Sequence, residues 1–223
     1  GDHVLDLCAE SAVYRQRSVD ELKRVVDIAN ALRRYHDAPE RVLIVTNVGG
    51  FSEARPRPVS ERRGLYDLVA ESLSRIDTAG CEIIPQTMPP FPWHFGGQRY
   101  HNLFVEADEI GAFCATYRMR VCLDVSHSKL ACNHAKTSFQ ELIRVVGPHT
   151  AHLHIADALG VDGEGLQIGD GDMDFVALAR DLDAYAPAAS LIPEVWQGHK
   201  NEGEGFWFAM ERLEAAFEAA RAA

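Results

Sequence analysis

The sequence predicts an α/β protein of the (β/α) barrel type. Short apolar runs alternate with longer stretches of helical periodicity, and successive runs mostly start about 30 to 40 residues apart. Each run also ends in polar or glycine residues. Strands that alternate with helices form a parallel sheet covered by helices. This pattern fits two architectures, an open doubly wound sheet and a closed barrel.

The ends of the predicted strands distinguish these two architectures. Polar side chains follow every run, whereas a doubly wound sheet concentrates its functional residues at one switch point. No GxGxxG segment follows the first run, which also argues against a dinucleotide-binding sheet. A barrel is therefore the favoured architecture. The predicted strands are residues 4–8, 42–45, 82–84, 121–123, 152–155 and 191–192.

Capping residues and apolar periodicity predict the helices between these strands. Ser18 and Ser138 each precede a glutamate by three residues, as in a capping box, and would open helices over 22–35 and 142–146. Ser60 would open a helix that Gly80 ends. Three further helices are predicted over residues 104–117, 175–185 and 206–222.

The length fits a single domain over residues 1–223, because 223 residues bury one full core but are few for two. A closed barrel has eight βα units, and six are visible here. We expect the first two units to precede Gly1 and to be missing from this chain. A homo-oligomer or attachment to a larger polypeptide is accordingly among the expected assemblies.

The composition excludes several classes of function. The net charge is −11, whereas a nucleic-acid-binding surface normally carries a basic patch. No run approaches the roughly 18 apolar residues of a membrane span, and no signal segment is recognisable. The five cysteines form no CxxC pair, so a zinc–cysteine site is not expected. Reduced thiols in a cytoplasmic protein are the expected state of these cysteines.

Three strand ends carry residues that could share a cation. Asp124 ends one strand and His127 follows three residues later, His154 lies near the end of the next strand, and Glu194 follows the last. Carboxylate and imidazole groups on neighbouring strand ends suit a divalent ion such as Mn²⁺, Mg²⁺, Co²⁺ or Zn²⁺ with positions left for substrate. We therefore expect a metal centre at this end of the barrel.

A family resemblance rests on four motifs in a fixed order. They are Asp124 with His127, His154 with Asp157, the glycine-rich segment 166–175, and Pro193 with Glu194. This order resembles the xylose isomerase-like superfamily, which includes sugar isomerases and epimerases, inosose dehydratases and endonuclease IV. The resemblance covers most of the chain and implies a TIM-type barrel. It also implies that Asp124, His154 and Glu194 bind the metal and that His127 contacts substrate.

One position departs from that family pattern. Family members usually place a glutamate after the fifth strand, as a metal ligand and acid/base group, where this chain has Gln86. An amide oxygen can bind a cation or a substrate, but it is not a useful proton acceptor. Endonuclease IV needs further histidines, and segment 46–50 contains none. The resemblance therefore implies sugar chemistry rather than DNA repair.

The remaining candidates would hold and transform a hydroxy-carbonyl substrate. Glu194 is the expected base of an enediolate mechanism, with Glu10 or His127 as the second proton carrier. Trp196, His199 and Lys200 lie between the last strand and the last helix. We expect them to contact substrate, and the free N–H groups of that helix start could bind a phosphate or carboxylate. The loop 163–171 could do the same.

Three functions remain open at the level of sequence. The first is an isomerase or epimerase acting on a sugar, a sugar phosphate or a sugar-derived acid. The second is a lyase, an inosose-type dehydratase on the same metal scaffold. The third is a non-catalytic sugar-binding barrel domain of a larger protein, which the amide at Gln86 favours.

Overall fold

Five parallel strands form the framework of the molecule. The computed structural model describes residues 3–35, 41–94 and 97–222. In spatial order the strands are β1 (Val42–Thr46), β3 (Cys81–Pro85), β7 (Val121–Asp124), β8 (Thr150–Ile155) and β11 (Ser190–Pro193). A single parallel bridge between Gln86 and Cys122 joins the first pair to the other three. All five strands therefore end at the same edge.

These five strands confirm five of the six predicted ones. The sixth prediction is wrong, because residues 4–8 have no strand partner in the described chain. This segment is fixed instead by the buried side chain of Leu7 and by one backbone bond, from Leu7 N–H to Val48 O at 2.8 Å. A single bond of this kind does not make a ladder.

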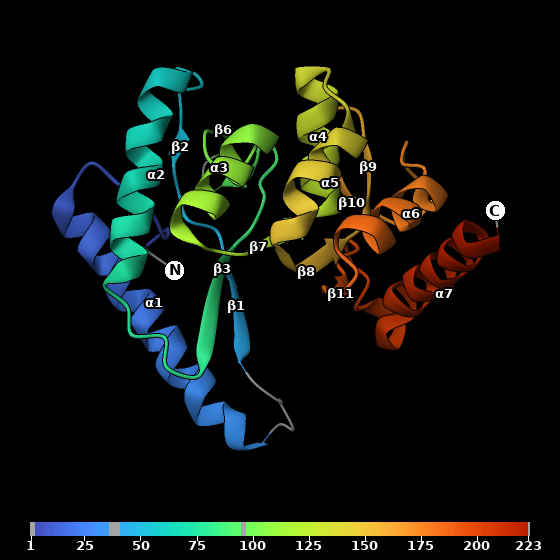
Figure 1. Cartoon of the computed structure of the whole chain (residues 1–223), viewed down its shortest axis with the longest axis horizontal. Helices are drawn as coiled ribbons and strands as arrows, with labels where there is room; N and C mark the ends of the chain where they lie inside the picture. The colour runs from blue at the N-terminus through green and yellow to red at the C-terminus, as the bar shows by residue number, and fades with distance from the viewer. Residues whose placement is uncertain (1–2, 36–40, 95–96, 223) are drawn as a thin grey trace.

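No closed barrel forms within the described residues. Strands β1 and β11 each pair on one side only, so the sheet has two free edges. Figure 1 shows the consequence, with the helices covering the outer side of a curved, open sheet. The fold is thus the TIM-type arrangement of alternating strands and helices without its closure.

Seven α-helices cover the strands. Ser138 caps its helix as predicted, since its hydroxyl accepts a hydrogen bond from Glu141 N–H at 3.2 Å. The helix that begins after Asp124 is not among the predicted ones. The helices are α1 (Ala12–Leu32), α2 (Val59–Ser74), α3 (Ala107–Tyr117), α4 (Val125–Ala135), α5 (Phe139–Val146), α6 (Phe175–Tyr185) and α7 (Lys200–Ala222).

Helix α1 begins earlier than the capping pattern predicted. Ser11 is its N-cap, and Ser18 lies inside the helix, fully buried. The Ser18 hydroxyl donates to Tyr14 O and accepts from Asp6 N–H, so it fastens the preceding segment to the helix. No helix among the described residues is long and apolar enough to cross a membrane.

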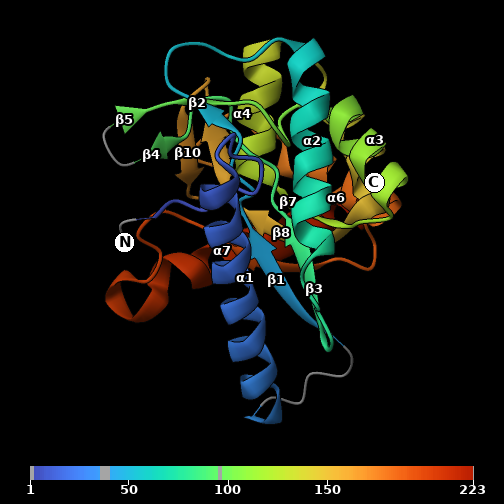
Figure 2. The same cartoon turned by 90° about the vertical axis from the view of Figure 1, so that its left-hand side faces the viewer.

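Short antiparallel strand pairs stand at the carboxyl ends of the strands. β2 (Phe51–Ser52) pairs with β6 (Tyr100–His101), and β4 (Trp93–His94) pairs with β5 (Gly97–Gln98). Figure 2 shows β2, β4 and β5 above the main strands. They build a rim around the end at which the polar side chains gather.

A further antiparallel pair, a hairpin, replaces part of a predicted loop. β9 (Asp157–Leu159) pairs with β10 (Gly163–Leu166), and the following turn wraps around the buried carboxylate of Asp157. That carboxylate accepts hydrogen bonds from the N–H groups of Gly169 and Gly171, each at 2.9 Å. Asp157 therefore organises the glycine-rich segment from within.

Replacing Gly171 with alanine should destabilise the protein by about 1–3 kcal/mol, because the added Cβ overlaps the Ala158 carbonyl oxygen and the Asp157 carboxylate. The matched control is Gly64→Ala on the exposed face of α2, where a Cβ meets nothing. This change should stabilise the protein by up to about 1 kcal/mol. Urea unfolding of both variants measures the difference, and equal stabilities would contradict the packing described here.

Candidate metal centre and active site

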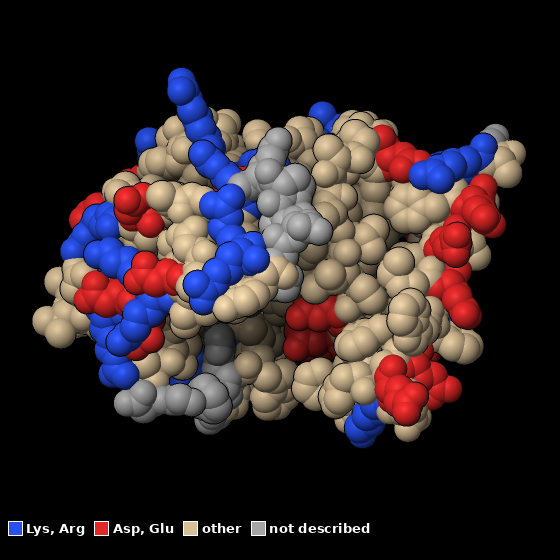
Figure 3. Space-filling model, turned by 90° about the horizontal axis from the view of Figure 1, so that it is seen from below, with Lys and Arg blue, Asp and Glu red and all other residues tan. Residues whose placement is uncertain are grey.

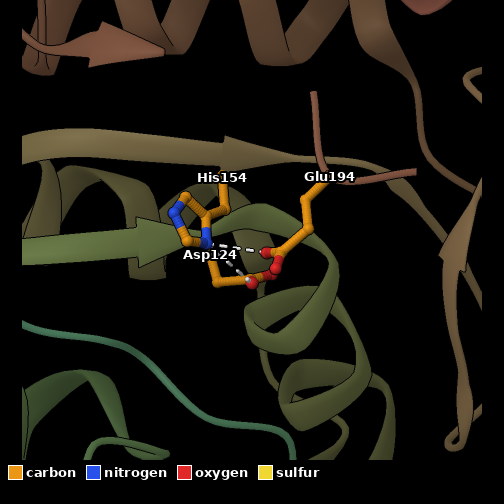
Figure 4. A group of neighbouring side chains, drawn as sticks. All are labelled: Asp124, His154 and Glu194. Atoms are coloured by element: carbon orange, nitrogen blue, oxygen red, sulfur yellow. Dashed lines mark ion pairs between the residues drawn. The ribbon is translucent and has the colours of Figure 1, made fainter. Parts of the chain in front are cut away.

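Three side chains converge at the carboxyl ends of β7, β8 and β11. Asp124, His154 and Glu194 point toward one another from three neighbouring strands (Figure 4). Each offers one ligand atom, and these atoms all lie within 4.8 Å of one another. His154 Nδ1 lies 2.7 Å from Glu194 Oε2 and 3.8 Å from Asp124 Oδ2. These three residues could hold a metal ion.

Asp124 is the most deeply buried member of this group. Its Oδ1 accepts a hydrogen bond from His127 N–H at 2.9 Å, so the same carboxylate also caps helix α4. Its Oδ2 accepts from Gln86 Nε2 at 2.8 Å. Burial removes the carboxylate from water and raises the pKa of Asp124. A cation beside it would offset this cost.

His154 and Glu194 form a charge pair at the more open side of the group. Burial opposes the charge of Glu194, but the hydrogen bond and charge of His154 outweigh it and lower the Glu194 pKa. Burial likewise opposes the charge of His154, yet the Glu194 carboxylate prevails and raises the His154 pKa. The Glu194 side chain remains 53% exposed, so it can reach a bound substrate.

Gln86 lies beside the same group, at the bridge that joins β3 to β7. Its Nε2 contacts Asp124 Oδ2 and lies 3.2 Å from His154 Nδ1. A half-turn of the amide exchanges its nitrogen for its oxygen, which could then face a cation. Gln86 is therefore placed either to support the carboxylate or to add an oxygen ligand.

His127 lies in the first turn of α4, and one of its ring nitrogens is hydrogen-bonded within the protein. Nδ1 lies 3.0 Å from the Thr87 carbonyl oxygen, which can only accept, so Nδ1 carries the hydrogen. Nε2 points the other way and lies 3.6 Å from Glu164 Oε2. This arrangement orients the ring toward the β9–β10 hairpin.

Sequence reasoning missed Glu164. It stands on β10, in a segment that was interpreted only as a glycine-rich loop. The dipeptide Asp162-Gly163 is a hairpin signal that could have indicated a strand there. Even so, only the folded hairpin shows that this carboxylate faces His127.

Four predicted site residues are not part of this group in the described chain. Glu10 is exposed and pairs with Arg57 at 2.8 Å. The Trp196 side chain is 75% exposed, and His199 and Lys200 are exposed as well. Lys200 Nζ donates to Gln197 Oε1 at 2.9 Å and contacts none of the three converging residues.

The donor set fits a divalent cation. Two carboxylates and one imidazole, with an amide beside them, are ligands that Mn²⁺, Mg²⁺, Co²⁺ or Zn²⁺ accept in proteins. Two carboxylates held this close repel each other, and His154, the His127 N–H group and the Gln86 amide offset part of that repulsion. The geometry defines the molecule as a (β/α) barrel protein with a carboxylate–histidine centre at its strand ends.

The chain belongs to the xylose isomerase-like TIM barrel family, whose family model matches residues 2–220. This confirms the resemblance inferred from the motifs. A comparison with curated proteins gives no significant match.

Solved structures of several sugar epimerases share the fold. A D-tagatose 3-epimerase-like protein superposes with a TM-score of 0.71 at 19% identity, over 98% of this chain and 75% of the other. An L-ribulose 3-epimerase gives 0.70 at 16% identity, over 98% and 73%. A 3-keto-D-glucoside 4-epimerase from E. coli gives 0.65 at 14% identity, over 96% and 77%. These TM-scores show the common fold.

His154→Ala should weaken Mn²⁺ binding by about 100-fold or more, since it removes a donor that the remaining residues cannot replace. The matched control is His152→Ala, which removes an imidazole two residues earlier on the same strand. The His152 ring bonds to Ser190 rather than to the carboxylates. Isothermal titration calorimetry measures both affinities. Equal losses in the two variants would contradict the assignment of His154 to the centre.

Metal affinity should also fall as the pH is lowered. A protonated imidazole cannot coordinate, so the cation competes with the proton on His154, whose pKa is raised above its ordinary value of about 6.5. Affinity should be full at high pH, and as the pH is lowered it should begin to fall before pH 6.5 is reached. Titrations with Mn²⁺ between pH 5.5 and 8.5 measure this. A midpoint well below 6.5 would show that His154 does not limit binding.

Proposed function

We propose that this chain is a metal-dependent isomerase or epimerase of a sugar, a sugar phosphate or a sugar-derived acid. The observation that carries the proposal is the convergence of Asp124, His154 and Glu194 at the strand ends. The similarity of the fold to those of solved sugar epimerases supports it. The same centre would also serve an inosose-type dehydratase.

Asp124, His154 and Glu194 would hold the cation, with Gln86 as an additional oxygen donor. A divalent ion bound there supplies Lewis acidity, which polarises the carbonyl and adjacent hydroxyl of a substrate and favours an enediolate. Which of Mn²⁺, Mg²⁺, Co²⁺ or Zn²⁺ binds depends on availability as much as on these ligands.

Glu194 is the proposed base. Its carboxylate is half exposed at the mouth, and the lowered pKa keeps it ionised near neutral pH. The neighbouring His154 holds its orientation through the 2.7 Å contact. In this position Glu194 can take a proton from a carbon next to the substrate carbonyl.

His127 is the proposed second proton carrier. Its Nδ1–H is fixed on Thr87 O, and its free Nε2 faces the hairpin side of the mouth. Glu10 is not retained for this role, because it pairs with Arg57 away from the converging group. In an isomerisation, Glu194 would take the carbon-bound proton and return it to the neighbouring carbon, while His127 Nε2 would take the proton of the substrate hydroxyl and return it to the former carbonyl oxygen.

A non-catalytic sugar-binding domain is the second candidate, and Gln86 is the observation that favours it. The amide gives the centre one titratable carboxylate fewer than a glutamate would, while every hydrogen bond to Asp124 stays satisfied. A site that only binds sugar needs a fully hydrogen-bonded Asp124 carboxylate, and it needs no second acid/base group.

Gln86→Glu should tighten Mn²⁺ binding, because it adds a negative charge beside Asp124 and His154. It should also lower turnover, since it changes the acid/base balance around Glu194. The assay measures metal affinity together with conversion of ketoses, inososes and sugar phosphates by the wild type and the variant.

The other outcomes separate the candidates. Higher activity of Gln86→Glu on a ketose would show that the wild-type centre has lost an ancestral acid/base group. Metal binding without conversion of any sugar by either protein would favour the sugar-binding domain over the enzyme.

A further inference from the structure

Two hydrogen-bond acceptors face each other at the mouth of the candidate site. His127 Nε2 and Glu164 Oε2 are 3.6 Å apart, which is too long for a hydrogen bond between them. Because Nδ1 carries its hydrogen toward Thr87 O, Nε2 of the neutral ring presents a lone pair. The Glu164 carboxylate presents lone pairs as well. Hydrogen-bond donors for His127 Nε2 and Glu164 must therefore come from a third group, such as a bound ligand.

The backbone holds Glu164 in this position. Gly165 N–H donates to Ser126 Oγ at 3.0 Å, and Gly165 O accepts from Trp196 N–H at 2.7 Å. Ser126 Oγ in turn donates to Asp157 O at 3.1 Å. The β9–β10 hairpin is thus fastened to the start of α4 on one side and to the segment after β11 on the other. Glu164 is a fixed part of the rim.

The charge around the mouth disfavours an anion. Asp124, Glu194 and Glu164 place three carboxylates around it. Residues 121–223 contain seven Lys and Arg against sixteen Asp and Glu. Figure 3 shows Lys and Arg gathered mainly over the α1 side of the molecule and acidic side chains over the α7 side and within the central hollow.

Two lysines on this side of the molecule already have partners. Lys129 Nζ lies 3.3 Å from Asp172 Oδ1, and Lys200 Nζ donates to Gln197 Oε1. Neither contacts His127 or Glu164 in the described chain. A phosphate at this side of the mouth would therefore meet carboxylates, and neither of these lysines is placed to bind it.

We propose that Glu164 is a substrate-binding and specificity-determining residue. Together with His127 it accepts hydrogen bonds from two hydroxyls on neighbouring carbons of an uncharged sugar. Each hydroxyl brings one donor to one acceptor, which a phosphate dianion or a carboxylate cannot do. This inference rests on the proposed function and narrows its substrate to a sugar that is unphosphorylated where it meets the hairpin.

The test compares Glu164→Gln with Asp162→Asn. Both variants remove one carboxylate from the same hairpin, but Asp162 is exposed and contributes only its backbone oxygen to Glu164. Calorimetry first measures Mn²⁺ affinity. D-fructose, D-tagatose and D-psicose, and then D-fructose 6-phosphate, are titrated into the Mn²⁺-loaded proteins. Conversion is assayed with the same sugars.

Glu164→Gln should bind the preferred ketose about tenfold or more weakly, as expected for a lost hydrogen bond to a charged acceptor. Its Mn²⁺ affinity should stay within about threefold of the wild type, and Asp162→Asn should match the wild type throughout. The phosphorylated ketose should bind the wild type more weakly than D-fructose. Glu164→Gln should reduce that difference.

Equal ketose affinity in Glu164→Gln and the wild type would overturn the role of Glu164. A wild type that prefers the phosphorylated ketose, or that binds Mn²⁺ but no neutral ketose, would overturn the substrate class while leaving the metal centre standing. Absence of Mn²⁺ binding to the wild type would overturn the proposed function and the role of Glu164 with it.

Discussion

The arrangement of the site depends on one buried charge, the carboxylate of Asp124. It ends β7, caps α4 through His127 N–H, and accepts the Gln86 amide. Its backbone is also fixed, because Asp124 N–H donates to Thr87 Oγ1 at 2.9 Å. One residue thus connects strand, helix and neighbouring strand. A charge with this little exposure persists only when it is hydrogen-bonded on every side or paired with a cation.

The rest of the site follows from parallel pairing. Because β7, β8 and β11 run in the same direction, their last residues meet at one edge and bring His154 and Glu194 to Asp124 without any long-range loop. The hairpin that carries Glu164 is then added from outside, tied by Gly165 to both flanks. Rigid strand ends place the metal donors, and a fastened rim places the substrate contacts.

Short-range sequence patterns predicted the strands and the helix cap, which depend mainly on neighbouring residues. The apolar runs predicted five strands, of which β3, β7 and β8 are largely buried on both faces, and Ser138 was a recognisable cap. The segment 4–8 is a similar run but has no strand partner among the described residues, and the sequence near a strand does not show what it pairs with. Asp124 was predicted as a ligand, while its capping of α4 was missed, because an Asp can serve both roles. Glu164 could not be assigned to the site, since its place depends on Ser126 and Trp196, far away in sequence.

The amide of Gln86 and the carboxylate of Glu164 are best understood together. A third carboxylate beside Asp124 and Glu194 would add repulsion within a space that already raises the pKa of Asp124. The Gln86 amide instead donates to that carboxylate and lowers the negative charge next to the centre. Glu164 lies on the rim and is partly exposed, so water screens its negative charge. A substrate hydroxyl could donate a hydrogen bond to it there. Under the proposed function, the strand ends would bind the cation and the hairpin would recognise substrate hydroxyls.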